Sequence, residues 1–310
     1  MRELIEHIRS RDRRAIARCM SLIENQAPEA AALLDQLYPF LGQAYRIGIT
    51  GPPGAGKSTL TAALTRQFRQ QGRRVGIVAV DPTSPFTGGA LLGDRIRMSE
   101  FATDPEVFVR SMASRGSTGG LAERAQEVAD VLDVAGYQII LLETVGVGQM
   151  ELDIADAADT TVVVLVPESG DSVQAMKAGL MEIADLFVVN KADREGAEVF
   201  ARDLRLTLHL RSAGESGWEP PILQTVATAG KGIETVFQKV LEHRAYLERE
   251  GLLEKRRTAH LEKRLRRQIE AAVLEQFWTP QREARFQKEF PRLVSGKITP
   301  RKLLKTLLKT

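Results

Sequence analysis

Short apolar runs alternate with stretches of helical period between residues 45 and 226, and this alternation is the strongest constraint on the fold. The runs are YRIGIT, RRVGIVAV, YQIILLE, TTVVVLVP, DLFVVN and PPILQTV. Strands that are apolar throughout are typical of a sheet covered on both faces, and parallel strands need crossover segments, which are usually helices. The sequence therefore predicts an α/β fold with a mainly parallel sheet flanked by helices.

The segments on either side of this region lack strand patterns. Residues 1–43 carry apolar residues at helical spacing, with Ser10 as a candidate cap, and the charged segment after about residue 232 also has a helical period. We predict a helical N-terminal region over 1–43, an α/β domain over 44–245 and a C-terminal helical arm over 246–310. Because so much exposed helix is hard to bury on one sheet, the arm is expected to pack against a second copy of the chain. The alternative is an arm folded back over its own domain.

The composition is that of an ordinary globular protein. Of 310 residues, 43% are apolar and 27% are charged, and a net charge of +3 is too small to indicate a nucleic-acid partner. No segment has the roughly 18 apolar residues of a membrane span. The basic N-terminus includes acids and lacks the apolar core of a signal peptide. We therefore expect a cytoplasmic protein that binds neither nucleic acid nor membrane.

Two smaller features have simple interpretations. The basic C-terminal segment RKLLKTLLKT could contact RNA or a membrane, but we expect a solvated basic face above packed leucines. The leucines expected to pack inward are Leu303, Leu304, Leu307 and Leu308. The single cysteine, Cys19, excludes an internal disulfide, and its place in an apolar helical stripe predicts a packed thiol.

A glycine-rich loop follows the first predicted strand and opens a helix. GPPGAGKS, residues 51–58, fits G-x-x-x-x-G-K-[ST], the phosphate-binding loop or P-loop. Its glycines let the backbone curl into a nest of N–H groups, and the helix that follows adds the positive end of its dipole. Lys57 is placed to reach the β and γ phosphates, and Ser58 offers a hydroxyl to Mg²⁺. The predicted nucleotide-binding residues here are Gly51, Pro53, Gly54, Ala55, Gly56, Lys57, Ser58 and Thr59.

Three acids are candidates for the magnesium environment, together with Ser58. Asp81 and Glu143 end apolar runs, and Asp94 lies in a glycine-rich stretch between them. Ligands of open parallel sheets bind outside the carboxyl ends of the strands, so Asp81 and Glu143 should face the phosphates. Lys57, Asp94 and Glu143 are therefore the candidate catalytic residues. Glutamate is one methylene longer than the aspartate common at such a strand end, so Glu143 is expected to act through a water.

The base is predicted from the stretch NKAD that follows another apolar run. A carboxylate at Asp193 can accept hydrogen bonds from both N1–H and N2–H of guanine, whereas with adenine it would remain a buried, unpaired charge. The stem of Lys191 can lie over the ring, and Asn190 can link neighbouring loops. In TVATAGKG, the backbone near Thr228 and Ala229 can meet guanine O6. These residues favour GTP over ATP.

Taken in order, these motifs resemble one family. GPPGAGKST, AVDPTSP, GGALLGDRIRM, ETVGVGQME, FVVNKAD and TVATAGKG are similar to the MeaB/ArgK family of P-loop GTPases, the methylmalonyl-CoA mutase-associated GTPases. The resemblance implies a homodimer, formed through the C-terminal arm, that binds GTP or GDP with Mg²⁺ and hydrolyses GTP. It further implies a chaperone that gates adenosylcobalamin loading of a cobalamin-dependent acyl-CoA mutase, such as methylmalonyl-CoA mutase, and protects that enzyme. Residues 167–179 match a segment that acts as an additional switch in the family.

Catalytic assistance is expected from residues outside the motifs already named. The N–H of Gly146 can reach the γ-phosphate, but Val147 stands where a water-orienting glutamine would be expected. Slow intrinsic hydrolysis is therefore expected, with Arg115 or Lys177 as candidate cations supplied when a client protein binds. Two other functions stay open at this point. A nickel-delivery GTPase would be expected to show clustered cysteine and histidine, and a P-loop small-molecule kinase has no need of N-K-x-D.

Overall fold

The computed structural model describes residues 2–81, 98–113, 120–144, 150–167, 179–211 and 217–309. Contacts divide the chain into two compact units, Met1–Arg257 and Thr258–Thr310. Each unit is described by itself below. None of the described helices is both long enough and apolar enough to cross a membrane.

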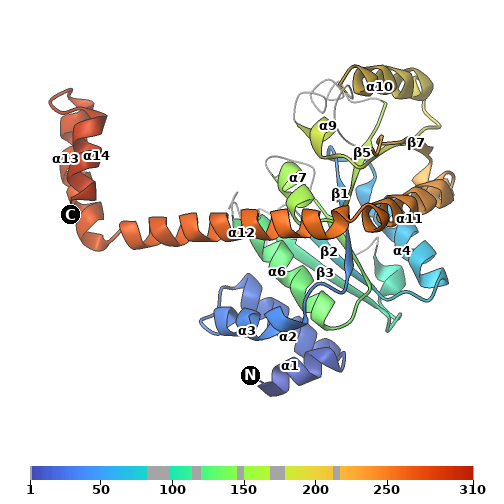
Figure 1. Cartoon of the computed structure of the whole chain (residues 1–310), viewed down its shortest axis with the longest axis horizontal. Coiled ribbons are helices and arrows are strands. Elements are labelled where there is room, and N and C mark those ends of the chain that lie inside the picture. Colours follow the sequence, from blue (N-terminus) through green and yellow to red (C-terminus); the bar gives the residue numbers. More distant parts are fainter. Residues whose placement is uncertain are drawn as a thin grey trace. The chain divides into compact units, whose positions relative to one another are not determined.

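The first unit is built on a seven-stranded sheet in which every pairing is parallel (Figure 1). The strand order is β3-β2-β4-β1-β5-β6-β7. The strands are β1 Tyr45–Thr50, β2 Val75–Asp81, β3 Val107–Ala113, β4 Ile139–Glu143, β5 Thr160–Leu165, β6 Leu186–Asn190 and β7 Ile222–Thr225. Because β1 is central, the loop after it lies beside the carboxyl ends of both β4 and β5. The predicted α/β fold with a parallel sheet is confirmed.

The strand β3 was not among the predicted runs. Its sequence, VFVRSMA, contains Arg110 and Ser111, which interrupt the apolar pattern. β3 is an edge strand with β2 as its one neighbour in the sheet, and both polar residues are only half-buried there. An edge position needs less apolar burial than a central one, so the pattern that identifies central strands does not identify β3.

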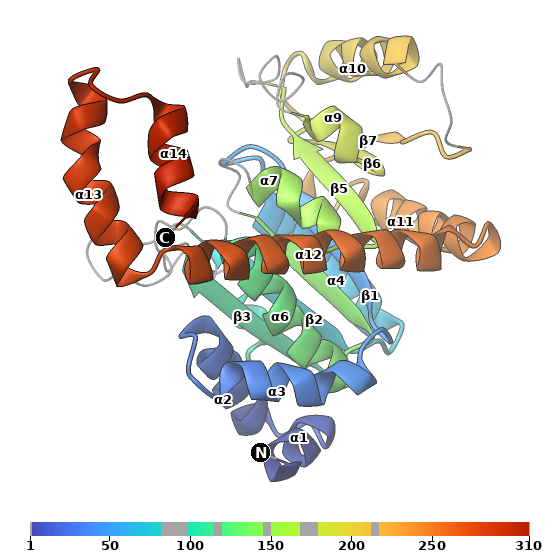
Figure 2. The same ribbon diagram turned by 60° about the vertical axis from the view of Figure 1, so that its left-hand side comes forward.

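Helices cover both faces of the sheet (Figures 1 and 2). On one face, α4 (Lys57–Gln70) and α11 (Ile233–Arg249) bury Leu60, Phe68 and Phe237 against alternate strand residues such as Ile47. The other face carries α6 Gly120–Val134, α7 Met150–Asp153, α9 Leu180–Ile183 and α10 Ala197–Arg211. Successive side chains along each strand point to opposite faces of the sheet, so a strand that is apolar throughout contributes to the cores on both faces.

The N-terminal helices α1 (Arg2–Arg9), α2 (Arg13–Glu24) and α3 (Ala30–Leu37) extend the second of these cores and pack around α6. Cys19 is fully buried in this cluster, and burial raises the pKa of its thiol to about 11, so the predicted packed thiol is confirmed. The candidate cap Ser10 was wrong. Asp12 caps α2 by accepting from the backbone N–H groups of Arg14 and Ala15, whereas the Ser10 hydroxyl donates to the His7 carbonyl.

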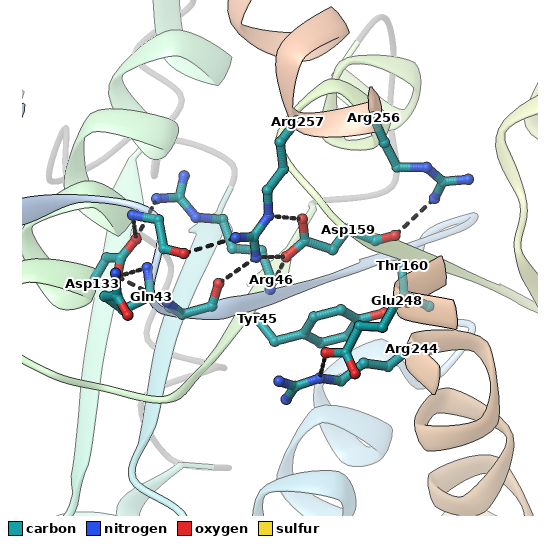
Figure 3. A network of polar contacts seen from close by, with 12 residues as sticks. Gln43, Tyr45, Arg46, Asp133, Asp159, Thr160, Arg244, Glu248, Arg256 and Arg257 are labelled. Carbon is teal, nitrogen blue, oxygen red and sulfur yellow. Dashed lines mark hydrogen bonds and ion pairs between the residues drawn. The ribbon is translucent and has the colours of Figure 1, made fainter. Parts of the chain in front are cut away.

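Charged side chains join the start of α12 (Leu252–Phe277) to the amino ends of the central strands (Figure 3). Arg257 donates two hydrogen bonds of 2.8 Å to the Asp159 carboxylate, just before β5. Arg256 makes a similar pair, at 2.8 and 2.9 Å, with Asp185, just before β6. Arg46 on β1 contacts Asp130 at 2.7 Å. This network lies at the end of the strands opposite to the P-loop.

The second unit contains the rest of α12, α13 (Pro280–Val294) and α14 (Pro300–Leu308). Both later helices begin with a threonine cap followed by proline, a standard helix start. Of the four leucines expected to pack inward, Leu303 and Leu307 are buried with Ile298, but Leu304 and Leu308 are 55% and 61% exposed. That prediction was half wrong, because this short helix buries one narrow stripe on its own unit.

Candidate functional site

The P-loop joins β1 to α4, and two of its glycines are required by close neighbours. Gly51 has a φ of +133°, and a Cβ added there would lie 2.0 Å from the Val164 carbonyl oxygen on β5. Gly56 has a φ of +90°, and its Cβ would lie 2.2 Å from Nδ2 of Asn190. Gly54 has a φ of +74°, but a Cβ added there would meet no other atom within 4 Å. The glycines therefore serve both the left-handed backbone and the tight approach of the loop to the neighbouring strands.

Lys57 begins α4 and folds back over the loop. Its side chain is buried, and its ammonium donates to the carbonyl oxygens of Gly51 at 2.8 Å and Pro52 at 3.0 Å. Positive charge is thus held against the curled loop, next to the N-terminus of a fourteen-residue helix. A glycine loop with left-handed residues, a helix N-terminus and a buried ammonium group together form a binding site for an anion such as phosphate.

Glu143 reaches this loop from β4. The parallel register pairs Ile49 with Glu143, so the acid ends its strand beside the start of the P-loop. Its Oε1 accepts a 2.5 Å hydrogen bond from the Ser58 hydroxyl, and the Thr61 hydroxyl lies 2.8 Å from Oε2. All three side chains are buried. The structure thus brings together Ser58 and Glu143, as predicted for residues that share one site.

Thr61 was missed by the sequence reasoning. It stands three residues after Ser58, so both hydroxyls lie on one face of α4. The signal that could have found it is this spacing, because a residue at i+3 from the P-loop serine must point toward the same strand.

The donor atoms of this cluster fit magnesium. Hydroxyl and carboxylate oxygens are the hard ligands that Mg²⁺ prefers. Asp81 ends β2 at the same edge of the sheet, two positions beyond Ala79, which pairs with Glu143. The Asp81 side chain, Asp94 and Gly146 lie outside the described residues, as do the candidate cations Arg115 and Lys177. Within the described ranges, no group of three or more His, Cys, Asp or Glu side chains converges on one point.

Asn190 links three segments at this end of the sheet. Its Nδ2 donates to the Ala55 carbonyl in the P-loop at 2.8 Å. Its Oδ1 accepts from the Thr225 hydroxyl at 3.0 Å and from the Ala227 backbone N–H at 3.1 Å. The side chain is 3% exposed. The predicted link between loops is present, and it ties the phosphate loop to the two loops proposed to read the base.

Those two loops lie next to each other. The Ala192 N–H donates to the Thr225 carbonyl at 3.0 Å, which holds the N-K-x-D turn against the end of β7. Lys191 has a left-handed φ of +56° and is half-buried, whereas Asp193 is exposed. The short helix η4, Ala227–Ala229, follows β7, with Thr228 and Ala229 exposed. The remaining predicted loop residues differ in burial: Pro53 is exposed, Ala55 is buried and Thr59 is half-buried.

Comparison with known proteins agrees with this geometry. The family model of MeaB, methylmalonyl Co-A mutase-associated GTPase, matches residues 16–282. A putative GTPase of Pyrococcus abyssi is 48% identical over 309 residues, covering 99% of this chain and 95% of that protein. A mitochondrial mouse protein named methylmalonic aciduria type A homolog is 34% identical, over 86% of this chain and 65% of its own length.

A solved structure supports the fold. The crystal structure of a LAO/AO transport system kinase superposes with a TM-score of 0.78 at 28% identity, covering 99% of this chain and 96% of that chain. The resemblance carried by the sequence motifs is confirmed, and the architecture is that of a P-loop NTPase. This chain belongs to the MeaB family of methylmalonyl-CoA mutase-associated GTPases and is itself a GTPase.

Proposed function

We propose that this GTPase acts as a chaperone of a cobalamin-dependent acyl-CoA mutase, such as methylmalonyl-CoA mutase. In this role it gates the loading of adenosylcobalamin and protects the mutase from inactivation, with GTP binding and hydrolysis as the switch. Two observations support the proposal. The family model that matches residues 16–282 is that of a methylmalonyl-CoA mutase-associated GTPase. A mouse relative carries the name methylmalonic aciduria type A homolog.

The structural observation that best supports one shared nucleotide site is the set of hydrogen bonds made by Asn190. A phosphate bound at the P-loop and a base bound at N-K-x-D belong to one ligand, so the distance between the two half-sites must be held constant. Asn190 connects Ala55 to Thr225 and Ala227 in one buried hydrogen-bonded unit. In this proposal Asp193 accepts from guanine, the stem of Lys191 covers the ring, and the backbone at Thr228 and Ala229 faces O6.

At the phosphate half-site, each residue has a stated task. Lys57 and the loop N–H groups stabilise negative charge on the transferring phosphoryl group. Ser58 holds Mg²⁺, with Asp81, Asp94 and Glu143 completing its surroundings and Gly146 contacting the γ-phosphate. A metal held by these residues would supply Lewis-acid stabilisation of the negative charge on the phosphates. Glu143 accepts a hydrogen bond from the Ser58 hydroxyl and would accept one from a water bound at this half-site.

The proposed assembly is a homodimer formed through the C-terminal arm over residues 246–310, which follows the domain over 44–245 in the sequence. The arm helix α12 exposes apolar side chains at every fourth position, and these are about half exposed. They are Leu261, Leu265, Ile269 and Val273. An exposed apolar stripe on a helix is typical of a protein–protein interface, and this proposal assigns the stripe to contact with a second copy of the chain.

The chaperone proposal is tested by reconstitution with a purified apo-mutase of the methylmalonyl-CoA type. Transfer of adenosylcobalamin into the mutase is followed by absorbance with no nucleotide, with GDP, with GTP and with a non-hydrolysable GTP analogue. We expect complex formation and a loading rate that differ between the GTP-bound and GDP-bound protein. Identical loading and no complex in all four conditions would remove the chaperone role while leaving the GTPase activity intact.

A further inference from the structure

The carboxylate of Glu143 is held at both oxygens by hydroxyls from a single helix. Ser58 donates to Oε1 at 2.5 Å, and Thr61 lies 2.8 Å from Oε2. Thr61 is fully buried and Glu143 is 3% exposed, so water does not readily substitute for either contact. A carboxylate bound at one oxygen retains rotation about its last torsion, whereas two donors on opposite oxygens fix its plane.

The same helix supplies a natural comparison for Thr61. Thr65, one turn further along α4, is also fully buried, and its hydroxyl donates to the Thr61 carbonyl at 2.8 Å. The Thr61 hydroxyl lies 2.9 Å from the Lys57 carbonyl oxygen and 2.8 Å from Glu143 Oε2, so its single proton is shared between these two acceptors. The two threonines therefore share residue type, helix, burial and backbone contact. They differ in the contact of Thr61 with Glu143.

This arrangement is compatible with a metal on Ser58. A hydroxyl that gives a lone pair to a cation keeps its proton, and that proton then points to a neighbouring acceptor. Oε1 of Glu143 is already in that place. Without the Thr61 hydroxyl, Oε2 would lose a buried donor, and the side chain would be freer to turn toward another donor or the metal itself.

We propose that Thr61 is a positioning residue for GTP hydrolysis, which sets the Glu143 carboxylate so that Oε1 stays on Ser58 and the group contacts magnesium through water. The proposal rests on the function proposed above for Ser58 and Glu143. Thr61 acts through Glu143, and its hydroxyl contacts lie at the phosphate half of the proposed site. Its loss is therefore expected to alter kcat and the response to Mg²⁺, with little change in the KM for GTP.

The test compares Thr61→Val, Thr61→Ser and the matched control Thr65→Val in the full-length protein. For Thr61→Val we expect a kcat about tenfold lower, a several-fold higher Mg²⁺ concentration for half-maximal rate, and a KM for GTP within about twofold of wild type. Thr61→Ser, which keeps the hydroxyl, is expected to recover wild-type behaviour within about twofold. Thr65→Val is expected to match wild type in all three quantities.

A binding measurement provides a readout that is independent of turnover. Fluorescent GDP is titrated in Mg²⁺ and again in EDTA. Thr61→Val is expected to reduce the gain in affinity that Mg²⁺ brings, while its affinity in EDTA equals that of wild type. If Thr61→Val and Thr65→Val give the same values in both assays, Thr61 is an ordinary core threonine and the proposal is wrong.

The variant Glu143→Gln separates this proposal from the one on which it depends. If Glu143→Gln leaves turnover and the Mg²⁺ response unchanged, the proposed role of Glu143 fails, and that of Thr61 fails with it. If Glu143→Gln is impaired and Thr61→Val is not, the role of Thr61 alone fails. Should Thr61→Val fold poorly by circular dichroism, Thr61→Ala is measured alone and combined with Glu143→Gln. Thr61→Ala is then expected to add nothing to the effect of Glu143→Gln, and an additive loss of kcat contradicts the proposal.

Discussion

At the scale of single residues, the site depends on side-chain length and on the number of hydrogen bonds that one side chain can make. Glu143 reaches two hydroxyls on α4 from the end of β4, and an aspartate would be one methylene short of that position. Asn190 satisfies a carbonyl, a hydroxyl and a backbone N–H with one amide group. These contacts are buried, so each unsatisfied partner would cost about 1–3 kcal/mol.

The glycines of the P-loop allow a matched test at this scale. Gly54 and Gly56 both have positive φ, but only the Cβ of an alanine at 56 would meet Asn190, at 2.2 Å. Gly56→Ala is therefore expected to lower the free energy of unfolding of the nucleotide-free protein by about 1–3 kcal/mol more than Gly54→Ala. Urea denaturation of both variants measures the difference. Equal destabilisation by the two variants would mean that Asn190 can move away from residue 56 without a loss of stability.

At the scale of elements, α4 and the strand ends explain why the site forms where it does. α4 carries Lys57, Ser58 and Thr61 on its first turns, and the parallel register places Glu143 beside them. At the opposite end of the same strands, α12 is held by paired arginines. Arg256 and His243 both contact the buried Asp185 carboxylate. Burial acts to raise the pKa of Asp185, but these partners outweigh it and lower the pKa below its usual value.

The attachment of α12 gives a prediction with a defined pH dependence. Arg256→Met removes three hydrogen bonds from the guanidinium group, two to the Asp185 carboxylate and one to the Asp159 carbonyl. It is expected to lower the free energy of unfolding by about 2 kcal/mol at pH 7. A lowered carboxyl pKa contributes stability above the unfolded-state value, about 3.9, and this contribution is lost as the pH falls further. The difference between the variant and wild type should therefore shrink below about pH 4.

The control Arg249→Met breaks an exposed pair with Glu250 and should cost less than about 0.5 kcal/mol. A difference that stays constant down to about pH 3 contradicts the role of Asp185.

At the scale of the whole molecule, the two compact units have different kinds of surface. The unit Met1–Arg257 buries its apolar residues in cores on both faces of the sheet. The unit Thr258–Thr310 has a small cluster around Ile298 and leaves the α12 stripe exposed. An apolar stripe on a charged helix indicates an interface, and the proposed partner is a second copy of the chain.

Dimer formation through α12 is tested with a charge placed on that stripe. Leu265→Glu is expected to shift the protein from dimer to monomer in sedimentation velocity, with basal GTP hydrolysis within about twofold of wild type. The control Ala271→Glu adds the same charge at an exposed position on the opposite side of the helix and should leave the assembly unchanged. If both variants sediment as the wild type does, the stripe does not form the dimer interface.

By itself, the sequence determined the parts that depend on local pattern. Apolar runs identified six of the strands, because a central parallel strand must be apolar on both faces, and residues 51–58 identified the P-loop by its residue order. Local pattern was insufficient for β3, since an edge strand tolerates Arg110 and Ser111, and for the cap of α2, since Ser10 and Asp12 are equally plausible in sequence.

The tertiary structure alone decided which residues meet. Thr61 contacts Glu143, 82 residues away, and Asn190 contacts Ala55, 135 residues away. No periodicity within either segment encodes these pairs, because they follow from the order β4-β1-β5-β6 and from the register of its strands. The sequence identified the chemical groups of a GTPase site, and the packing of helix α4 against the sheet determined how Glu143 is held within it.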